Sequence, residues 1–580
     1  MRKIWFLLVV AAGLAATSSF GQAPAFSKVV LFGDSLSDTG NVRERTSSKS
    51  SGAIDYPSHT FNYDNGRFTN DTDTDPASHT YLGVWHEQLA RDFLGLTPAS
   101  NSLGGGLNYA FGGATTTDGT HEEVEKTPLG DITITIDDMG KQMDDYFASH
   151  VIDPSALYIV WGGNNDIRND DTSASVTATV GRVDALVSRL ATAGAHYILV
   201  PNVVPLGDIP RYSGTPKGAT ANQASAEYRR ELADSLNALQ SSLAAQGFTP
   251  VIYQVDMWAD AVRVYSNGPH FGFANITSPS QDNSDANPDQ YIFWDDVHPT
   301  TAGHHRLALT AFNTITGPSP SPSKALNIST RVFVDTGERV SIAGFTVTGD
   351  TAKKVLIRGL GPSLPKSGVP TPLGNPTVTL FDNTGTSIAA NDDWKNSPDA
   401  AEVMSSGLAP TEDLESALIA TLAPGQYTAQ LSGSSDGTGN GVIEVYDFAV
   451  SSSSVLANLS TRGSVGAGDD VMIAGVIIGD GDSPILVFRA LGPSLANFGV
   501  SNPLADPTLE LYDANASLIA SNDDWQDPQF QAVAATNLAP SNIKESAIVS
   551  ALLAPGNYTA VVRGKNNTTG VAVVEMYNVR

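Results

Sequence analysis

The second half of the chain repeats itself over a period as long as a whole domain. Residues 327–331 read Asn-Ile-Ser-Thr-Arg and recur 131 positions later, at 458–462, as Asn-Leu-Ser-Thr-Arg. Further matched segments are 358–364 with 489–495, 391–394 with 522–525, and 423–429 with 554–560. A period of this length exceeds a solenoid unit and fits tandem domains. Apolar and polar residues alternate within the repeats, which is typical of antiparallel β-sandwiches. The sequence therefore predicts two β-sandwich repeats, residues 326–450 and residues 451–580.

Residues 24–315 show the different pattern of an α/β domain. Continuous apolar runs predict strands at 28–33, 156–161, 196–200 and 251–255. Such runs suit strands that are covered on both faces, as in parallel sheets. Amphipathic stretches near 176–193 and 222–246 predict helices between them. Because strands and helices alternate, we expect a three-layer α/β sheet. Alternating Pro and Ser after Gly317 mark residues 316–325 as a linker.

Composition excludes several classes of function. The chain has 580 residues, no cysteine and a net charge of −28, from 33 basic and 61 acidic side chains. The absence of cysteine excludes disulfides, thiolate metal sites and a cysteine nucleophile. A nucleic-acid partner is not expected, because binding a phosphate backbone needs a basic surface.

The first 23 residues predict export. Arg2 and Lys3 precede the apolar run 4–16, and small residues then lead to a cleavage position after Ala23. This is the pattern of a secretory signal peptide, residues 1–23. A membrane anchor is the weaker interpretation, since the run is shorter than the ~20 residues of a span. We therefore expect a secreted or extracytoplasmic protein (periplasm, cell surface or extracellular) whose mature form has no transmembrane segment.

Two distant segments of residues 24–315 together contain a serine, a histidine and a carboxylate. Ser35 follows the strand 28–33 directly, within Gly-Asp-Ser-Leu. Asp295 and His298 are three positions apart, in Asp-x-x-His-Pro. That spacing lets the carboxylate orient the imidazole, as a hydrolytic triad requires. Taken alone, the first segment could equally cap a helix and the second could be a surface turn.

Two glycine-rich segments could supply an oxyanion hole. Gly112 and Gly113 lie within 108–115, and Asn164 and Asn165 follow the glycines of 161–166. A backbone N–H of glycine and the side-chain amide of asparagine can both donate hydrogen bonds to a developing negative oxygen. Separately, such glycine pairs are usually turns.

Together, and in this order, the four segments resemble the GDSL esterase/lipase family of the SGNH hydrolases. The segments 67–70 and 85–90 strengthen the resemblance, and Gly-Asp-Ser-Leu-Ser-Asp-Thr-Gly-Asn at 33–41 is similar to the lecithinase-like, phospholipase-like branch. The resemblance implies a flavodoxin-like SGNH sheet and no cofactor or metal. The polar, acidic insert 71–80 departs from the family pattern at a position that could alter the substrate-binding rim.

The resemblance also implies a role for each matched residue. Ser35 matches the nucleophile, His298 the general base, and Asp295 the residue that orients it. The oxyanion hole consists of the N–H groups of Ser35 and Gly113 and the side chain of Asn165. Alignment to Gly-x-Asn-Asp favours Asn165 over its neighbour, because Asp166 follows it.

These features predict a secreted serine esterase or lipase that acts on acyl-lipid or short-chain acyl esters. Its partner is a small-molecule or lipid ester, with glycan or cell-surface contact through the β-repeats as a further expectation. Two alternatives stay open: an adhesin or carbohydrate-binding protein with a degenerate hydrolase, and an acetyl-glycan esterase that its repeats target. Trp394 and Trp525 could be sugar platforms, although core tryptophans are more common. Asp71, Asp73 and Asp75 imitate a calcium loop but lack its glycine and distal glutamate.

Overall fold

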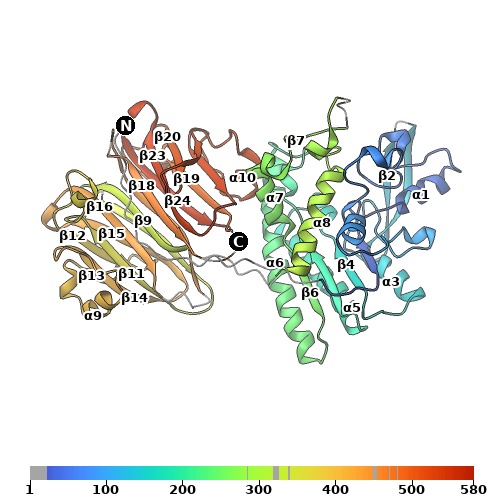
Figure 1. Ribbon diagram of the computed structural model, residues 1–580, viewed down its shortest axis with the longest axis horizontal. Helices are drawn as coiled ribbons and strands as arrows, with labels where there is room; N and C mark the ends of the chain where they lie inside the picture. The colour runs from blue at the N-terminus through green and yellow to red at the C-terminus, as the bar shows by residue number, and fades with distance from the viewer. Residues whose placement is uncertain are drawn as a thin grey trace. The chain divides into compact units, whose positions relative to one another are not determined.

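The computed structural model describes residues 23–579, except 128, 282, 284, 318–324, 338–339, 449–453, 469, 480 and 482. Contacts divide the chain into two compact units, one made mainly of residues 17–319 and one mainly of 320–580. The first is an α/β unit and the second consists largely of strands (Figure 1). Nearly all of the predicted signal peptide and most of the linker lie outside the described residues.

The centre of the α/β unit is a parallel sheet of four strands. Its order is β1 (Val29–Gly33), β4 (Leu157–Trp161), β5 (Tyr197–Pro201) and β6 (Val251–Val255). Beyond β1, Asn108 forms an isolated parallel bridge to Leu31, so a rudimentary fifth strand extends this edge. The resulting order is that of flavodoxin-like sheets, in which ligands gather at the carboxyl ends of the strands.

Helices cover both faces of this sheet. One core contains side chains of α3 (Met139–Ser149), α5 (Ser173–Thr192) and α6 (Pro216–Ala245) packed against alternate strand residues such as Phe32. The opposite core contains side chains of α2 (Trp85–Gln88), α7 (Met257–Ser266) and α8 (Thr301–Thr316). The predicted three-layer α/β fold is therefore confirmed, and the continuous apolar strands are explained by burial on both faces.

The remaining elements of this unit lie outside the sheet. They are α1 (Asn41–Lys49), α4 (Asn164–Asn169), the antiparallel hairpin β2 (Thr120–Thr127) with β3 (Gly130–Asp137), and the parallel pair β7 (Asn275–Pro279) and β8 (Tyr291–Phe293). In β3, Ile132, Ile134 and Ile136 alternate with threonines and pack into a small core, whereas β2 alternates exposed and half-buried residues that are mostly polar. Among the described residues, none of the helices is long and apolar enough to cross a membrane.

The described residues of the β-rich unit form sixteen antiparallel strands, eight from each repeat. Repeat 1 supplies β9 (Ala325–Val334), β10 (Ser341–Thr348), β11 (Lys353–Leu360), β12 (Pro376–Phe381), β13 (Ser387–Asn391), β14 (Ser416–Leu422), β15 (Gly425–Gly433) and β16 (Gly439–Asp447), with helix α9 (Ala400–Ser405). Repeat 2 supplies β17 (Val455–Val465), β18 (Met472–Ile478), β19 (Leu486–Leu491), β20 (Pro507–Tyr512), β21 (Leu518–Asn522), β22 (Ser546–Ser550), β23 (Gly556–Gly564) and β24 (Gly570–Asn578), with helix α10 (Phe530–Ala535). The prediction of β-rich domains after the α/β domain is confirmed.

The two repeats exchange strand partners about a local two-fold axis. Strand β10 pairs with β17 in the register Ile342↔Arg462, and β18 pairs with β9 in the equivalent register Ile473↔Arg331. On the axis, the hydroxyl oxygens of Thr330 and Thr461, which are 131 positions apart, lie 2.8 Å from each other. The sequence predicts two tandem β-sandwich repeats, and in the structure the two repeats lie in one compact unit and share a hydrophobic core.

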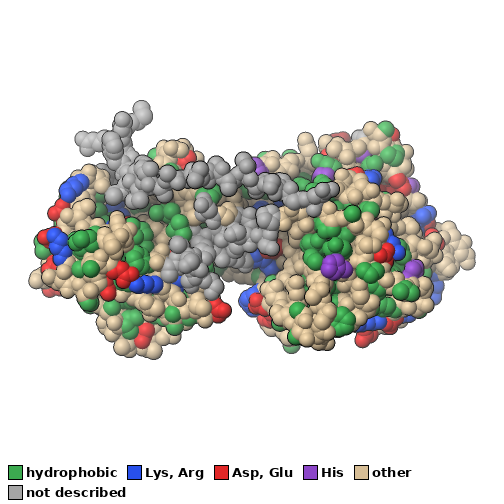
Figure 2. Space-filling view, turned by 60° about the horizontal axis from the view of Figure 1, so that its bottom comes forward, with side chains coloured by type: hydrophobic (Ala, Val, Ile, Leu, Met, Phe, Trp, Pro, Cys, Tyr) green, Lys and Arg blue, Asp and Glu red, His purple; other side chains and the backbone are tan. Residues whose placement is uncertain are grey.

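The recurring motifs of the repeats have structural roles. The buried carboxylate of Glu415 accepts hydrogen bonds from the backbone N–H groups of Gly361 and Ser363, and Glu545 does the same for the second repeat. Trp394 and Trp525 are only 4% and 9% exposed, so both are core residues rather than surface platforms for sugars. On the face shown in Figure 2, acidic side chains are scattered over the surface and do not form one large patch.

Because the repeats share a core, we expect a cavity in one repeat to destabilise both. Leu459→Ala removes a buried side chain of β17 that lies opposite Phe345 of β10. Such a truncation lowers the free energy of unfolding by about 2–5 kcal/mol. Amide hydrogen exchange should therefore accelerate in strands of both repeats. Leu518→Ala, at an exposed position of edge strand β21, is the control. Faster exchange in only one repeat would show that the repeats unfold independently.

Candidate active site

The structure brings together the three residues predicted to form a triad. Ser35 lies in the turn that follows β1, and His298 lies in the loop that precedes α8. The Oγ of Ser35 is 2.9 Å from Nε2 of His298, and Nδ1 of His298 is 2.7 Å from Oδ2 of Asp295. When Nδ1–H donates to the carboxylate, Nε2 is left to accept the proton of the serine hydroxyl, as a serine hydrolase requires.

Asp295 is held by its own loop and by a tyrosine. Its Oδ1 accepts hydrogen bonds from the backbone N–H groups of Val297 (2.7 Å) and His298 (2.6 Å), while the hydroxyl of Tyr63 donates to Oδ2 at 2.8 Å. Burial raises the pKa of Asp295, but the charge of His298 and these hydrogen bonds outweigh burial and hold the pKa at about 2. Asp295 is therefore a carboxylate at any pH at which the protein would work.

The segment 67–70 positions the loop that carries the histidine. The ring of Phe68 stacks on that of His298, with ring centres 5.0 Å apart. The hydroxyl of Thr69 donates to the carbonyl of Pro299 at 3.0 Å, and Oδ1 of Asn70 accepts from the backbone N–H of Thr301 at 2.8 Å. In the sequence, this segment supports only a family resemblance, and neither its residues nor Tyr63 carry a signal of this role.

The backbone donors expected for an oxyanion hole have no protein acceptor. In the part of the chain that the structure describes, this holds for the N–H groups of both Ser35 and Gly113. The N–H of Gly112, by contrast, donates to Oδ2 of Asp38 at 3.0 Å, which favours Gly113 as the donor. Gly113 has a φ of +81°, a left-handed backbone conformation that favours glycine over residues with a Cβ.

Asn164 and Asn165 both line the pocket beside the triad. The amide of Asn165 donates to the carbonyl of Ala114 at 2.9 Å, and its Oδ1 accepts from Arg168 at 2.6 Å. An amide group carries two hydrogens, so Asn165 has a second one available for an oxyanion. The amide of Asn164 donates to Oδ2 of Asp34 at 3.0 Å, and burial raises the pKa of this aspartate. Asn164 was not among the predicted site residues; it fixes the residue that precedes the nucleophile.

Other residues of the motifs connect the segments to one another. Asp38 accepts the N–H of Gly112 and thereby ties the nucleophile turn to the glycine segment. Asp166 accepts from the backbone and hydroxyl of Thr116, beyond the same glycines. Gln142 of α3 both donates to and accepts from the backbone of Gly33 at 2.9 Å. These contacts place the carboxyl end of β1 and the two glycine-rich segments at one edge of the sheet.

A buried histidine beside the nucleophile turn predicts an acid sensitivity. His86 of α2 lies 3.0 Å from the carbonyl of Ser37, and burial lowers its pKa to about 4. Between pH 6.5 and 4 the unfolded chain therefore binds a proton that the folded chain does not, so stability is complete above pH 6.5 and falls on acidification. Because of His86 alone, the free energy of unfolding should fall by about 3 kcal/mol between pH 7 and pH 4.

Urea unfolding at both pH values measures this loss. His86→Gln should show a smaller loss of the free energy of unfolding on acidification than the wild type. The exposed His196→Gln is the matched control and should follow the wild type. An equal loss in the wild type and in His86→Gln would contradict the assignment.

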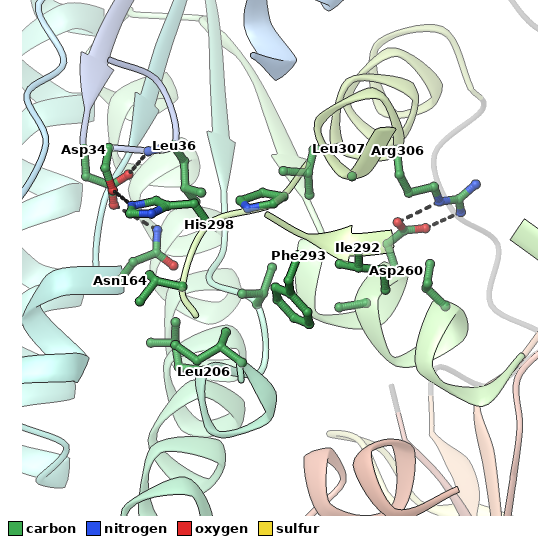
Figure 3. A pocket seen from close by; sticks show the side chains of 18 of the residues that line it. Asp34, Leu36, Asn164, Leu206, Asp260, Ile292, Phe293, His298, Arg306 and Leu307 are labelled. Atoms are coloured by element: carbon green, nitrogen blue, oxygen red, sulfur yellow. Dashed lines mark hydrogen bonds and ion pairs between the residues drawn. The ribbon is translucent and has the colours of Figure 1, made fainter. Parts of the chain in front are cut away.

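An apolar pocket opens directly beside the triad. The space between its lining atoms is about 840 Å³, a figure that includes open solvent at the mouth. Ser35, His298 and the two asparagines line one end, and many of the other lining residues come from the loop after β5, from α7, from β8 and from α8. Figure 3 shows His298 and Asn164 close together at this end, with apolar side chains beyond them.

The predicted acidic loop contains one cluster of ionisable residues. His59 lies with Nδ1 3.1 Å from Asp71 and with Nε2 2.9 Å from Asp73. Each ring nitrogen thus faces a carboxylate, and both aspartates are partly exposed to solvent. The side chains of His59, Asp71 and Asp73 offer ligand atoms that all lie within 4.8 Å of one another, so this surface group could hold a metal ion.

Comparison with known proteins agrees with this geometry. Residues 29–310 match the family described as GDSL-like Lipase/Acylhydrolase. A phosphatidylcholine-sterol acyltransferase of Aeromonas hydrophila is 25% identical over 357 residues, which cover 53% of this chain and 95% of that protein. A GDSL esterase/lipase of Arabidopsis thaliana is 24% identical over 325 residues, covering 50% of this chain and 89% of that protein. An uncharacterised protein of Pseudomonas putida is 27% identical, and the match spans 55% of this chain and 54% of that relative.

Solved structures match about half of this chain at low similarity. An acetylxylan esterase of Geobacillus stearothermophilus has 14% sequence identity and a TM-score of 0.25, over 51% of this chain and 96% of that one. A lipolytic protein of the G-D-S-L family from Veillonella parvula has 13% identity and a TM-score of 0.25, over 49% and 96%. The family match and the curated relatives lead to one conclusion: within residues 29–310, the chain carries a domain of the GDSL lipase/acylhydrolase family, a class of ester-bond hydrolases.

Proposed function

We propose that this protein is an extracytoplasmic serine esterase that hydrolyses carboxylic esters of apolar acyl groups through an acyl-enzyme on Ser35. The observation that carries the proposal is the continuous chain of contacts from Ser35 through His298 to Asp295, with distances of 2.9 and 2.7 Å. Residues far apart in sequence meet in this arrangement only because the fold places both loops at the carboxyl edge of the sheet.

The mechanism follows from the properties of these groups. A serine hydroxyl is a weak nucleophile until a base removes its proton. His298 takes the proton as Ser35 attacks the ester carbonyl. The N–H groups of Ser35 and Gly113 and the amide of Asn165 then stabilise the oxyanion, because they donate where negative charge develops. His298 returns the proton to the departing alcohol, and a water molecule, activated by the same imidazole, releases the acid from Ser35.

The substrate class follows from the pocket next to the nucleophile. Its lining is predominantly apolar, so an aliphatic acyl chain would lose contact with water there, at a gain of about 0.8 kcal/mol per CH₂. The names of two relatives, an acyltransferase acting on phosphatidylcholine and a GDSL esterase/lipase, agree with an acyl ester substrate. The location outside the cytoplasm is supported by the signal-peptide pattern of residues 1–23.

Labelling with a fluorophosphonate tests the proposal most directly. The mature protein, beginning at residue 24, should react in stoichiometric amounts, and peptide mass spectrometry should locate the adduct on Ser35. The same preparation should hydrolyse 4-nitrophenyl esters. Absence of both labelling and hydrolysis in a folded preparation would refute the proposed activity. Failure of a full-length chain to leave the cytoplasm of an expressing bacterium would refute the proposed location alone.

A further inference from the structure

The pocket beside the triad has two chemically different ends. At one end lie Ser35 and His298, and at the other lie Asp260 of α7 and Arg306 of α8. Figure 3 shows these ends on opposite sides of the apolar side chains of Leu206, Ile292, Phe293 and Leu307. A chain bound covalently to Ser35 and directed into the pocket would therefore run along apolar groups toward an ion pair.

Two hydrogen bonds and a contact with an aromatic ring hold the ion pair in place. Nε of Arg306 donates to Oδ2 of Asp260 at 2.9 Å, and a second guanidinium nitrogen bonds to Oδ1. The guanidinium also lies over the ring of Phe271, 4.6 Å from its centre. The side chain of Asp260 is 6% exposed and that of Arg306 is 23% exposed. The pair is thus largely withdrawn from solvent and borders the apolar space of the pocket.

The ion pair affects how the binding free energy depends on the length of the acyl chain. Each CH₂ group that enters the apolar space is favourable, so binding should improve as the acyl chain grows. A chain that reaches the ion pair must displace it, and separating one partner from a buried pair is strongly unfavourable. Burial of several further CH₂ groups would be needed to offset the free energy of separating the pair. The gain in binding free energy with chain length therefore ends where the chain meets the ion pair.

We propose that the Asp260–Arg306 ion pair sets the maximum acyl-chain length that this site accepts. The preferred substrates are then esters of unbranched aliphatic acids short enough to end before the pair, rather than esters of long-chain fatty acids. This inference rests on the proposed function, because it assumes that the acyl group is attached to Ser35 and occupies the pocket.

A chain-length series tests the inference. For the wild type, kcat/KM for 4-nitrophenyl esters from acetate to palmitate should rise and then fall. The double variant Asp260→Ser with Arg306→Ala removes both charges and opens the end of the pocket. In this variant the fall should move to longer chains, and the ratio of kcat/KM for laurate to that for butyrate should rise at least about tenfold, the worth of two further CH₂ groups.

A second variant shifts the limit in the opposite direction. Ala261 lies on α7 beside Asp260 and lines the same pocket. Ala261→Phe fills part of the space, so the fall should begin at shorter chains. The control is Arg189→Ala, because Arg189 also combines an ion pair, with Asp144, and a cation–π contact, over Phe147, but lies outside the pocket. Its chain-length profile should equal that of the wild type.

Binding to an inactive variant separates this inference from the proposed function. Saturated fatty acids of increasing length are titrated calorimetrically into Ser35→Ala, with and without the double replacement, after circular dichroism shows that both are folded. Affinity should reach its maximum at a longer chain when the pair is removed. Identical profiles with and without the pair, in binding or in hydrolysis, would overturn the inference. Absence of hydrolysis by the wild type, together with a shifted binding profile, would instead overturn the proposed function.

Discussion

Ser35→Ala is expected to lower kcat for ester hydrolysis by about 10⁶-fold, the size of the effect when a serine hydrolase loses its nucleophile. Alanine cannot form the acyl-enzyme, so only binding and the oxyanion donors remain. Ser35 is 8% exposed and its Oγ contacts His298, so the change removes one hydroxyl and leaves the fold intact. Single-turnover and steady-state assays with a 4-nitrophenyl ester measure the loss.

The matched control is Ser27→Ala. The hydroxyl of Ser27 donates to Asp153 at the surface, 2.8 Å away, and has no place in the mechanism. This variant should retain the activity of the wild type and its labelling by fluorophosphonate. Ser35→Ala should lose both. Hydrolysis by Ser35→Ala within tenfold of the wild type would show that another group is the nucleophile.

Asp295→Asn is expected to lower kcat by about 10⁴-fold. The carboxylate holds Nδ1–H of His298 and stabilises the imidazolium that forms during attack. An amide of the same shape can instead donate to Nδ1, which leaves Nε2 protonated and unable to accept the serine proton. The depressed pKa of Asp295, about 2, means that the carboxylate is charged over the whole pH range of the assay.

The adjacent residue supplies the control for this prediction. Asp296 forms a two-pronged ion pair with Arg211 and is half exposed. Asp296→Asn should therefore change kcat little, because surface pairs contribute at most about 1 kcal/mol. Equal losses in Asp295→Asn and Asp296→Asn would contradict a specific role for Asp295, and thermal unfolding of both variants excludes a loss of structure as the cause.

Much of the fold and of the candidate site could be predicted from the sequence, because the signals are local. The apolar runs at β1, β4, β5 and β6 identify strands that are buried on both faces. Ser35, Asp295 and His298 stand in short motifs whose chemistry depends on residues next to them in the chain. Burial that depends on a residue's neighbours in space leaves no such signal, and so Tyr63 and Phe68 were not assigned to the site.

The residues that support the triad could not be identified from short sequence motifs. Tyr63 donates to Asp295 from 232 positions away, and Phe68 stacks on the imidazole from an equally distant loop. A motif identifies the residue that reacts, but the group that orients it can come from any element that packs nearby. The same holds for Arg306, which is an ordinary charged residue of a helix until Asp260 of another helix closes the pocket with it.

The β-rich repeats show which features the sequence determines and which depend on the tertiary structure. By itself the sequence determined that residues 326–580 contain two copies of one β-rich pattern, and that Ser35 and His298 belong to a hydrolase domain. Alternation specifies which face of a strand is buried, but any strand with the same alternation could lie beside it. Only the tertiary structure decided that β10 pairs with β17 and β9 with β18, because that choice depends on side chains that interlock across a common core.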